Sequence, residues 1–421
     1  MAGETTTVGS STPTSQQGYG LRKGVLPQWA TVAQSLSSIA PTASPAMVIP
    51  LVVAVSGRSS WLAYLVATIA ASLVALHINV FARSSASPGS LYAFVLDELG
   101  FWPGLFAGWA VLIAYVGTAS AVTAGIVHYA QGSFGGAWPR VSGGAALIVA
   151  SVAIATLLAY KNVGLSARFM LAVEATSIAL ILLLFFYPSA THRLFLDRSQ
   201  LSPEVFHLEP VRAGLILATF SFVGFESATA LGAEAHSPLT TIPRAVLSTT
   251  IVSGALFIFS AYAEVASFGG KLDLLTESSA PLQLLVQLKG IAWLAPLLTV
   301  GAITSFFACT LACLTAASRA ALLISKQGVL PAHLSRTHQQ NQTPHIAVVA
   351  CGVGALVPAV WLTLRHVSAF DVYGWIGTVA TFGFVVAYVL VVAAALEHLR
   401  RAKELNLSHA LVGVVTLGFL C

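Results

Sequence analysis

Charged residues are scarce in this chain, where they make up only 8% of 421 residues. Soluble domains carry about 25%. A water-soluble fold of this length would lack the polar side chains needed to cover its surface. Hydrophobic residues, in contrast, account for 57% of the sequence. The composition therefore excludes an ordinary soluble protein and predicts an integral membrane protein.

Cysteine is also rare, with four residues scattered at positions 309, 313, 351 and 421. This pattern predicts neither a disulfide framework nor a zinc site. The sequence has no His-Glu-x-x-His or Gly-x-Ser-x-Gly motif and no aspartate pair at working spacing, so an intramembrane enzyme is a remote alternative. A channel is another remote alternative, but the sequence contains no repeated selectivity-filter motif and no ring of charged residues. We expect no metal and no cofactor.

Apolar runs long enough to cross a bilayer, about 20 residues each, recur along almost the whole chain. Ten spans are predicted, at Ala33–Val55, Trp61–Phe81, Gly104–Val127, Ala145–Ala159, Phe169–Phe186, Ala213–Leu231, Val246–Phe268, Ala292–Ala316, Ile346–Leu364 and Trp375–Leu396. An eleventh apolar run begins near Ala410 and is short for a crossing. The lipid bilayer is thus an expected partner.

The domain organisation follows from these runs. Residues 1–25 are rich in Ser, Thr, Gly and Gln and predict a disordered cytoplasmic tail. Residues 26–401 form a ten-span domain with halves at 26–187 and 211–401, and residues 402–421 form a linker and a truncated eleventh span. No segment between spans is long enough for a soluble domain.

The distribution of basic residues predicts the orientation. With the N-terminus inside, twelve of the 20 Lys and Arg residues fall on inner connections and eight on outer ones. This bias favours a cytoplasmic N-terminus, with the connections Pro188–Pro210 and Gly269–Gly290 outside. The net charge of +5 is explained by these basic loops rather than by nucleic acid. Spans rich in Ala and Val are typical of a bacterial inner membrane.

Two predicted spans contain residues that break helices. The first carries Pro41 and Pro45 beside Thr42 and Ser44, and the sixth carries Gly224 next to a carboxylate. In lipid a helix can open only where protein or a water-filled cavity satisfies the freed backbone groups. Proline and glycine can also simply bend membrane helices for packing. Breaks in the first and sixth of ten spans, however, are typical of a midplane binding site in transporters built from inverted repeats.

Such breaks have a chemical consequence. A half-helix that starts near Ser44 exposes N–H groups and a positive dipole end, which attract a carboxylate. Open carbonyls around Pro41, Phe220 and Val223 would attract an ammonium group. A zwitterion satisfies both.

Four stretches resemble the amino acid-polyamine-organocation superfamily of secondary transporters. The segment "FSFVGFESATALGAEAHSPLTTIPRA", Phe220–Ala245, is similar to its sixth span and following loop. "PGSLYAF", Pro88–Phe94, resembles the Gly-Gly-x-Tyr entry to span three, and residues 316–347 resemble the loop after span eight. "IAPTASPAMVIP" resembles its first span. The resemblance implies an all-α polytopic membrane protein with an inverted five-plus-five helix repeat, the leucine-transporter-type fold.

The resemblance also implies a substrate site. The family's Gly-Ser-Gly in span one, whose amides hold a substrate carboxylate, falls on Ala43, Ser44 and Pro45. Because Pro45 has no N–H, the contact would rely on Ser44, Ala46 or side chains, or the ligand is not an α-carboxylate.

Further positions follow from the same likeness. The family's gating aromatic in span six falls on Phe220, and the carbonyls for the amine fall on Phe220 and Val223. Tyr115 falls where an aromatic lines the pocket. Together with these, the candidate substrate-binding set includes Pro41, Thr42, Ala43, Ser44, Ala46 and Gly224.

Two carboxylates inside spans are candidates for coupling. A lone carboxylate at the bilayer centre costs about 2.5 to 3.5 kcal/mol on insertion scales. The resemblance implies that Glu226 belongs to a proton-sensitive gate; alternatively, it holds the break in shape by hydrogen bonds. Glu174 in span five either substitutes for a lysine found on this helix in some proton-coupled relatives or lies wet near the inner surface. Sodium would instead want hydroxyls such as those of Thr304 and Ser305.

Together these observations predict a secondary transporter that moves an amino acid or related amine by alternating access. Proton-coupled symport is the expected mode, and amino acid or polyamine exchange is the alternative. The sequence leaves the oligomeric state open.

Overall fold

The computed structural model describes residues 18–134, 140–161, 163–187, 197–269 and 271–420. Within these residues the chain is almost entirely helical and has no named strand. The helices are α1 (Gln28–Ile39), α2 (Ile49–Ser56), α3 (Ser60–Ala82), α4 (Ser90–Leu99), α5 (Phe101–Phe134), α6 (Arg140–Lys161), α7 (Val163–Phe186), α8 (Leu208–Phe220), α9 (Pro238–Ser267), α10 (Leu272–Thr276), α11 (Pro281–Leu288), α12 (Leu294–Lys326), α13 (His345–Leu364), α14 (Ala369–Arg401) and α15 (Leu407–Leu420).

Eight helical stretches in the described part of the chain are long and apolar enough to cross a membrane. One of them, Gln28–Ala82, contains the first two predicted spans, and the other seven match the third to fifth and seventh to tenth. The sixth predicted span is missing from the set because its helix, α8, ends after 13 residues. The eleventh apolar run forms the 14-residue α15.

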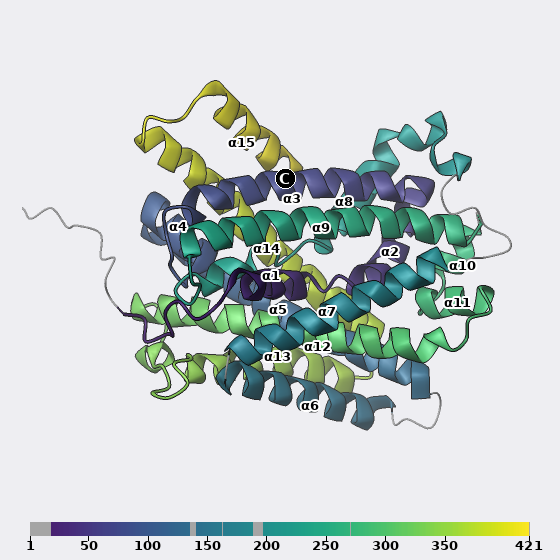
Figure 1. The fold of residues 1–421 in the computed structure, drawn as a ribbon, viewed down its shortest axis with the longest axis horizontal. Helices are drawn as coiled ribbons and strands as arrows, with labels where there is room; N and C mark the ends of the chain where they lie inside the picture. Colours follow the sequence, from purple (N-terminus) through teal and green to yellow (C-terminus); the bar gives the residue numbers. More distant parts are fainter. Residues whose placement is uncertain (1–17, 135–139, 162, 188–196, 270, 421) are drawn as a thin grey trace, which may run out of the picture.

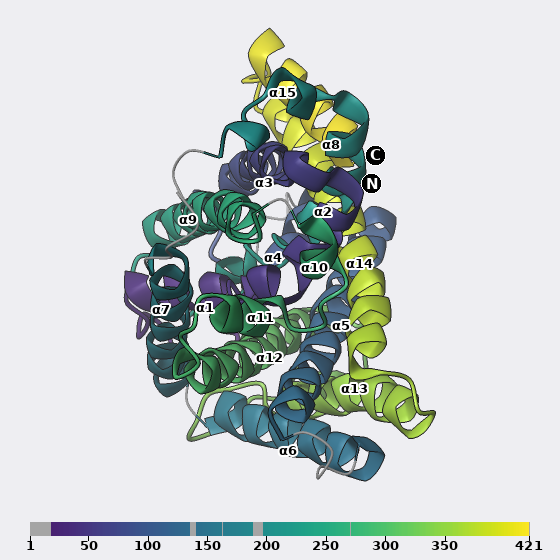
Figure 2. The same ribbon diagram turned by 90° about the vertical axis from the view of Figure 1, so that its right-hand side faces the viewer.

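The long helices run in the same general direction and form a bundle around α1 (Figure 1). Viewed along the bundle, α1 is enclosed by α7, α9 and α12 (Figure 2). The helix α5 packs along α12 and α14, α3 packs along α9, and α6 with α13 form a layer at one side. The most enclosed positions of the bundle therefore belong to the broken first span.

Small residues allow several of these helices to approach closely, as is usual in membranes. A Cβ atom on Gly383 of α14 would lie 2.8 Å from the Ala110 carbonyl oxygen of α5. One on Gly254 of α9 would lie 2.3 Å from the Thr68 side chain of α3. These glycines bring α5, α14, α3 and α9 close enough to enclose the middle of the molecule.

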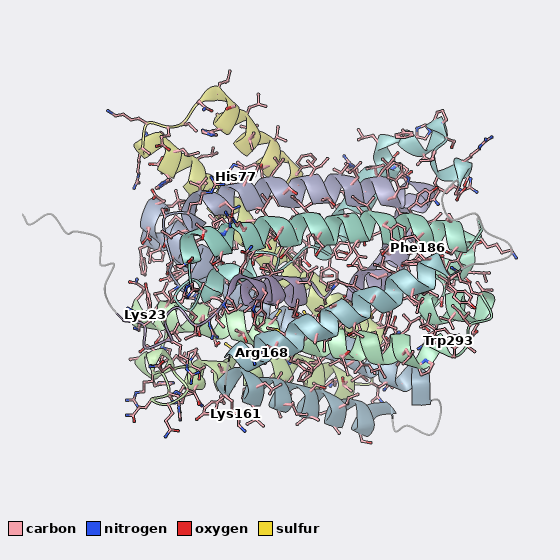
Figure 3. The ribbon with its side chains drawn as sticks, in the orientation of Figure 1. Lys23, His77, Lys161, Arg168, Phe186 and Trp293 are labelled. Atoms are coloured by element: carbon pink, nitrogen blue, oxygen red, sulfur yellow. The ribbon has the colours of Figure 1, made fainter. Side chains whose placement is uncertain are left out.

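The two ends of the bundle differ. Lys23 lies at one end of the bundle, which we call the N-terminal face, and Phe186 and Trp293 lie toward the other, the opposite face (Figure 3). At the opposite face Lys289 Nζ donates to the Leu184 carbonyl oxygen at 2.8 Å, so a positive charge satisfies the C-terminal end of α7. Burial lowers the pKa of Lys289 from its ordinary value.

The predicted tail divides into two parts. Residues 1–17 lie outside the described residues. Residues 18–25 follow an irregular path, but Leu21 is buried and the Val25 N–H donates to the Glu234 carbonyl oxygen at 2.9 Å. These last residues before α1 are thus part of the packed structure at the N-terminal face.

Candidate functional site

The first span is broken where its prolines predict. Helix α1 ends at Ile39, and Ala40, which precedes Pro41, adopts a left-handed conformation with φ 49°. A proline disfavours the helical conformation in the residue before it and cannot donate a backbone hydrogen bond. After a turn, Ser44–Val48 form a π-helical segment that leads into α2.

The sixth span is also broken at the predicted place. Helix α8 ends at Phe220, turns follow through Glu226, and Ser227–Leu231 form a 3₁₀-helix. Gly224 has φ 89°, a conformation that a residue with a side chain rarely adopts. Both predicted interruptions are therefore confirmed.

The two breaks lie against each other. A Cβ atom on Gly224 would be 3.0 Å from the Ser38 Cβ atom. Just beyond, the Ala228 N–H donates to Ser35 Oγ at 2.9 Å, and Ser227 Oγ donates to the Gln34 carbonyl oxygen at 3.1 Å. The end of α1 and the segment after α8 thus satisfy part of each other's open backbone.

A small cavity lies between the breaks. Its volume is about 20 Å³, enough for roughly one water molecule. An amino acid can enter only if the surrounding helices separate. Its walls are Ser38, Ile39, Ala40, Ala43, Ser44, Val48, Thr118, Val122, Phe220, Ser221, Val223, Cys309 and Tyr373.

Four of the predicted substrate-binding residues line this cavity, namely Ala43, Ser44, Phe220 and Val223. The other five, Pro41, Thr42, Ala46, Tyr115 and Gly224, are not among its lining residues. In this conformation the Ala46 N–H donates to the Thr42 carbonyl oxygen at 3.1 Å, so the donor expected there is already engaged.

Nine lining residues were not in the predicted set, and among them Thr118 on α5, Cys309 on α12 and Tyr373 on α14 bring polar or aromatic side chains from helices outside the two breaks. The Tyr373 ring packs edge-on against Phe220, with ring centroids 5.7 Å apart. Cys309 Sγ lies 3.2 Å from the Ser38 carbonyl oxygen. Thr118 could have been found, because it lies one helical turn beyond Tyr115. Nothing local in the sequence marks Cys309 or Tyr373.

Glu226 is fully buried and is held by two tyrosines. Its Oε1 accepts a hydrogen bond from the Tyr115 hydroxyl at 2.7 Å, and its Oε2 accepts one from the Tyr388 hydroxyl at 2.6 Å. The Tyr388 hydroxyl also accepts the Gly224 N–H at 3.3 Å. The carboxylate therefore ties α5 and α14 to the broken segment, and Tyr115 serves this contact rather than the cavity wall.

Glu174 is buried as well, so the interpretation that places it in water is wrong. Its Oε2 accepts a hydrogen bond from Ser305 Oγ of α12 at 2.8 Å. Its Oε1 has no hydrogen-bond partner among the described residues. Thr304, considered with Ser305 for sodium, instead donates to the Val300 carbonyl oxygen of its own helix at 2.7 Å.

A buried ion pair that sequence reasoning overlooked closes the N-terminal face. Arg319 of α12 forms a two-point contact with Glu234, with Nε–Oε2 at 2.6 Å and Nη2–Oε1 at 3.0 Å. Both side chains are almost completely buried. The Glu234 carbonyl oxygen accepts the Leu26 N–H at 3.0 Å, and the His236 N–H donates to the Leu26 carbonyl oxygen at 2.9 Å. The sequence signal that could have revealed this ion pair is that Arg319 and Glu234 are charged residues within apolar segments.

The opposite face is hollow. A cavity of about 910 Å³ lies among the end of α5, residues 276–283 and residues 363–370. His128 Nε2 of α5 lies 2.7 Å from the Ser279 carbonyl oxygen at its wall. The N-terminal face is thus sealed around Leu26 and the ion pair, although a surface hollow of about 640 Å³ lies at this face beside residues 335–345, and the opposite face holds the larger hollow.

Comparisons with known proteins agree with this architecture. The sequence is 26% identical over 368 residues to an uncharacterized transporter of Mycobacterium tuberculosis (strain ATCC 25618 / H37Rv), covering 86% of this chain and 79% of the relative. It is 25% identical over 331 residues to the branched-chain amino acid permease of Bacillus subtilis (strain 168), covering 72% of this chain and 68% of that one.

Among solved structures, a Na⁺-coupled sialic acid symporter has a similar fold. The TM-score is 0.59 at 15% sequence identity, with 94% of this chain and 89% of that chain covered. At this identity the likeness shows the fold alone, the leucine-transporter type expected from the sequence.

The family model described as amino acid permease matches residues 31–420. With two broken spans that meet at a central cavity and a bundle of membrane-length helices around them, the chain belongs to the amino acid permease family and is a multi-pass membrane transporter rather than an enzyme.

Proposed function

We propose that this transporter moves an amino acid or a related amine across a bacterial inner membrane by alternating access, as a proton-coupled symporter. The observation that carries the proposal is the contact between the two breaks. Backbone that is not helical is tolerated at membrane depth only where protein or a cavity satisfies it, and in repeat-built transporters this is where substrate binds. The family match and the permease named in Bacillus subtilis support the substrate class.

In this proposal the substrate binds between Ala43 and Ser44 on one side and Phe220 and Val223 on the other. Opening of the helices enlarges the cavity and frees backbone groups of both breaks. Amides near Ser44 take the carboxylate, and the carbonyls of Phe220 and Val223 take the amine. Phe220 and Tyr373, which pack together, separate the cavity from the side chains beyond it.

The orientation belongs to the same proposal. With the N-terminus in the cytoplasm, the sealed N-terminal face is cytoplasmic and the large cavity opens outward. The bias of twelve inner over eight outer basic residues supports this arrangement.

Uptake by the purified protein in lipid vesicles tests the proposal directly. A labelled amino acid should accumulate when the outside is acidified. Ala43→Trp should abolish uptake, because the indole fills a cavity of about 20 Å³ and blocks its expansion. Ala153→Trp, at an exposed position of α6, is the matched control and should transport normally. If a broad panel of amino acids and polyamines gives neither uptake nor counterflow, the substrate class is wrong.

We assign the coupling proton to the buried carboxylates Glu226 and Glu174. Glu226 is faced by the hydroxyls of Tyr115 and Tyr388, and Glu174 by Ser305. Replacing either acid by Gln removes the titrating group while keeping its size, so the pH dependence of uptake should flatten. Glu209→Gln, which replaces an exposed acid, is the control and should leave the pH dependence of uptake unchanged. Unaltered pH profiles in both buried variants would exclude this coupling role.

A further inference from the structure

A fourth buried acid, Glu264 on α9, has no role in the site described above. Its side chain is fully buried, and neither carboxylate oxygen has a hydrogen-bond partner among the described residues. Glu226, Glu174 and Glu234 each accept at least one hydrogen bond. An unpaired charge inside a membrane protein is costly, and buried ionisable groups of this kind mark ion pathways. Glu264 therefore requires a neutralising partner.

The neighbours of Glu264 offer oxygen and no positive charge. None of the ion pairs in the described residues includes it. Ser260 and Ser267 lie four residues before and three residues after it, so they share its face of the helix. Both hydroxyls are buried and unpartnered in the same way. Three oxygen-bearing side chains without hydrogen-bond partners in the described residues thus lie on one face of α9.

The titratable groups whose charges lie within electrostatic range of Glu264 are tyrosines, Tyr64 of α3 and Tyr129 of α5. Segments α2 and Ser44–Val48, which also contact α9, contain no ionisable side chain. Asp273 of α10 is exposed. On the helices that pack along α9, Arg168 of α7 is exposed, and His77 of α3 lies two residues before Asn79, which contacts Pro243 near the other end of α9. The ion pairs of the described residues therefore leave the Glu264 carboxylate without a basic partner.

These two tyrosines, Tyr64 and Tyr129, each contact one of the breaks. The Tyr64 hydroxyl lies 3.0 Å from Ser221 Oγ, directly after the end of α8 and in the wall of the small cavity. The Tyr129 hydroxyl donates to the Ala46 carbonyl oxygen of the first span at 3.1 Å. Figure 2 shows α9 between α3 and α7, beside α1. The two tyrosine hydroxyls on α3 and α5 thus bond to residues of both breaks, Ser221 and Ala46.

We propose that Glu264, with Ser260 and Ser267, forms an ion site separate from Glu226 and Glu174 that takes a monovalent cation, either a proton or Na⁺. Carboxylate and hydroxyl oxygens suit both, since each is a hard acceptor. The cation neutralises the carboxylate, and its arrival or departure changes the field at Ser221 and Ala46. This inference rests on the proposed transport function, because it makes the site part of ion coupling.

The apparent melting temperature of the purified full-length protein in detergent tests the site without transport. A cation that binds only the folded state raises this temperature. If the cation is a proton, the melting temperature of the unaltered protein should rise on acidification in the absence of sodium. If the cation is Na⁺, the melting temperature should rise at alkaline pH when Na⁺ replaces choline. Glu264→Gln should have a smaller rise than the unaltered protein, because a neutral amide does not bind a cation in place of a carboxylate, while Glu226 and Glu174 keep their share of the response to acid. Glu209→Gln should keep the full rise.

Two results would overturn the proposal. One is a Glu264→Gln protein whose melting temperature responds to pH and Na⁺ as the unaltered protein does. The other is an unaltered protein that responds to neither cation. If Glu264→Gln does not fold, Glu264→Asp provides the test. Its shorter side chain keeps the carboxylate but moves it away from the serines, so the half-maximal rise in melting temperature should need a higher cation concentration. An unchanged cation response of this variant would count against the site.

Uptake separates this inference from the proposed function. A protein that takes up no amine yet has a smaller cation response in Glu264→Gln leaves the ion site standing and removes the substrate assignment. A protein that takes up an amino acid with identical cation dependence in Glu264→Gln and Glu209→Gln keeps the proposed function and removes the ion site.

Discussion

The four glutamates buried in the described part of this transporter have four different surroundings. Glu226 is held by two tyrosine hydroxyls, Glu234 by Arg319, and Glu174 by one serine, whereas Glu264 has no hydrogen-bond partner in the described residues. In the sequence they are alike, each an acid among apolar residues. Their surroundings separate acids whose two oxygens are both hydrogen-bonded, Glu226 and Glu234, from Glu174 and Glu264, which have at least one oxygen without a hydrogen-bond partner in the described residues.

At this scale the Arg319–Glu234 pair yields a prediction. Arg319→Met should lower the free energy of unfolding by about 3–5 kcal/mol, because it leaves the Glu234 carboxylate buried without a charge partner. The double variant Arg319→Met with Glu234→Leu should recover most of this loss, since two apolar side chains of similar size need no compensation. Thermal unfolding of the detergent-purified proteins measures both. A single variant as stable as the unaltered protein would show that Glu234 finds another partner.

At the scale of elements, the broken spans are the feature on which the site depends. The breaks were predictable because their causes are local: Pro41 and Pro45 remove backbone donors, and Gly224 permits φ 89°. The short helices α4, α10 and α11 were not predicted, because helices of 10, 5 and 8 residues are too short to appear as spans in a hydropathy profile.

The conformation of Gly224 can be tested by substitution. Gly224→Ala should destabilise the protein by about 1–3 kcal/mol, because a side chain is strained at positive φ. Its Cβ atom would also press on Ser38, so uptake should fall. In Gly374→Ala on α14 a Cβ atom meets nothing within 4 Å. This control should be as stable as the unaltered protein or slightly more so, and equal behaviour of the two variants would argue against a required break.

For the whole molecule, the difference between its two faces indicates the motion that transport needs. The N-terminal face is sealed by the bridge between Leu26 and Ala235 and by the buried ion pair beside it. The opposite face contains the large cavity. If transport follows the proposed alternating access, the sealed face opens in each cycle, and we expect the contacts of Leu26 and Glu234 to break.

A cross-link across the sealed face tests this requirement. Cysteines introduced together at Leu26 and Ala235, joined by oxidation or by a short bifunctional reagent, should stop uptake, and reduction of the disulfide should restore it. The native Cys309, Cys313 and Cys351 are buried. Each single cysteine variant is the control and should transport under the same oxidation. Full uptake by the cross-linked protein would mean that this face does not open.

Composition and local pattern were sufficient to predict the membrane class, the positions of the long apolar helices, and the two breaks. Each depends on residues close together in the chain, since hydropathy acts over one span and proline or glycine acts on its own backbone. Four residues of the cavity, Ala43, Ser44, Phe220 and Val223, followed from the breaks and the family resemblance.

Only the tertiary structure decided which distant residues meet. Tyr388 reaches Glu226 across 162 positions, Ser305 reaches Glu174 across 131, and Arg319 reaches Glu234 across 85. The residue pattern of one helix does not show which face of another helix it will contact, because such contacts depend on how the helices rotate and pack. For the same reason only the folded arrangement separates the acids that are tied from Glu264, whose oxygens have no hydrogen-bond partner in the described part of the chain.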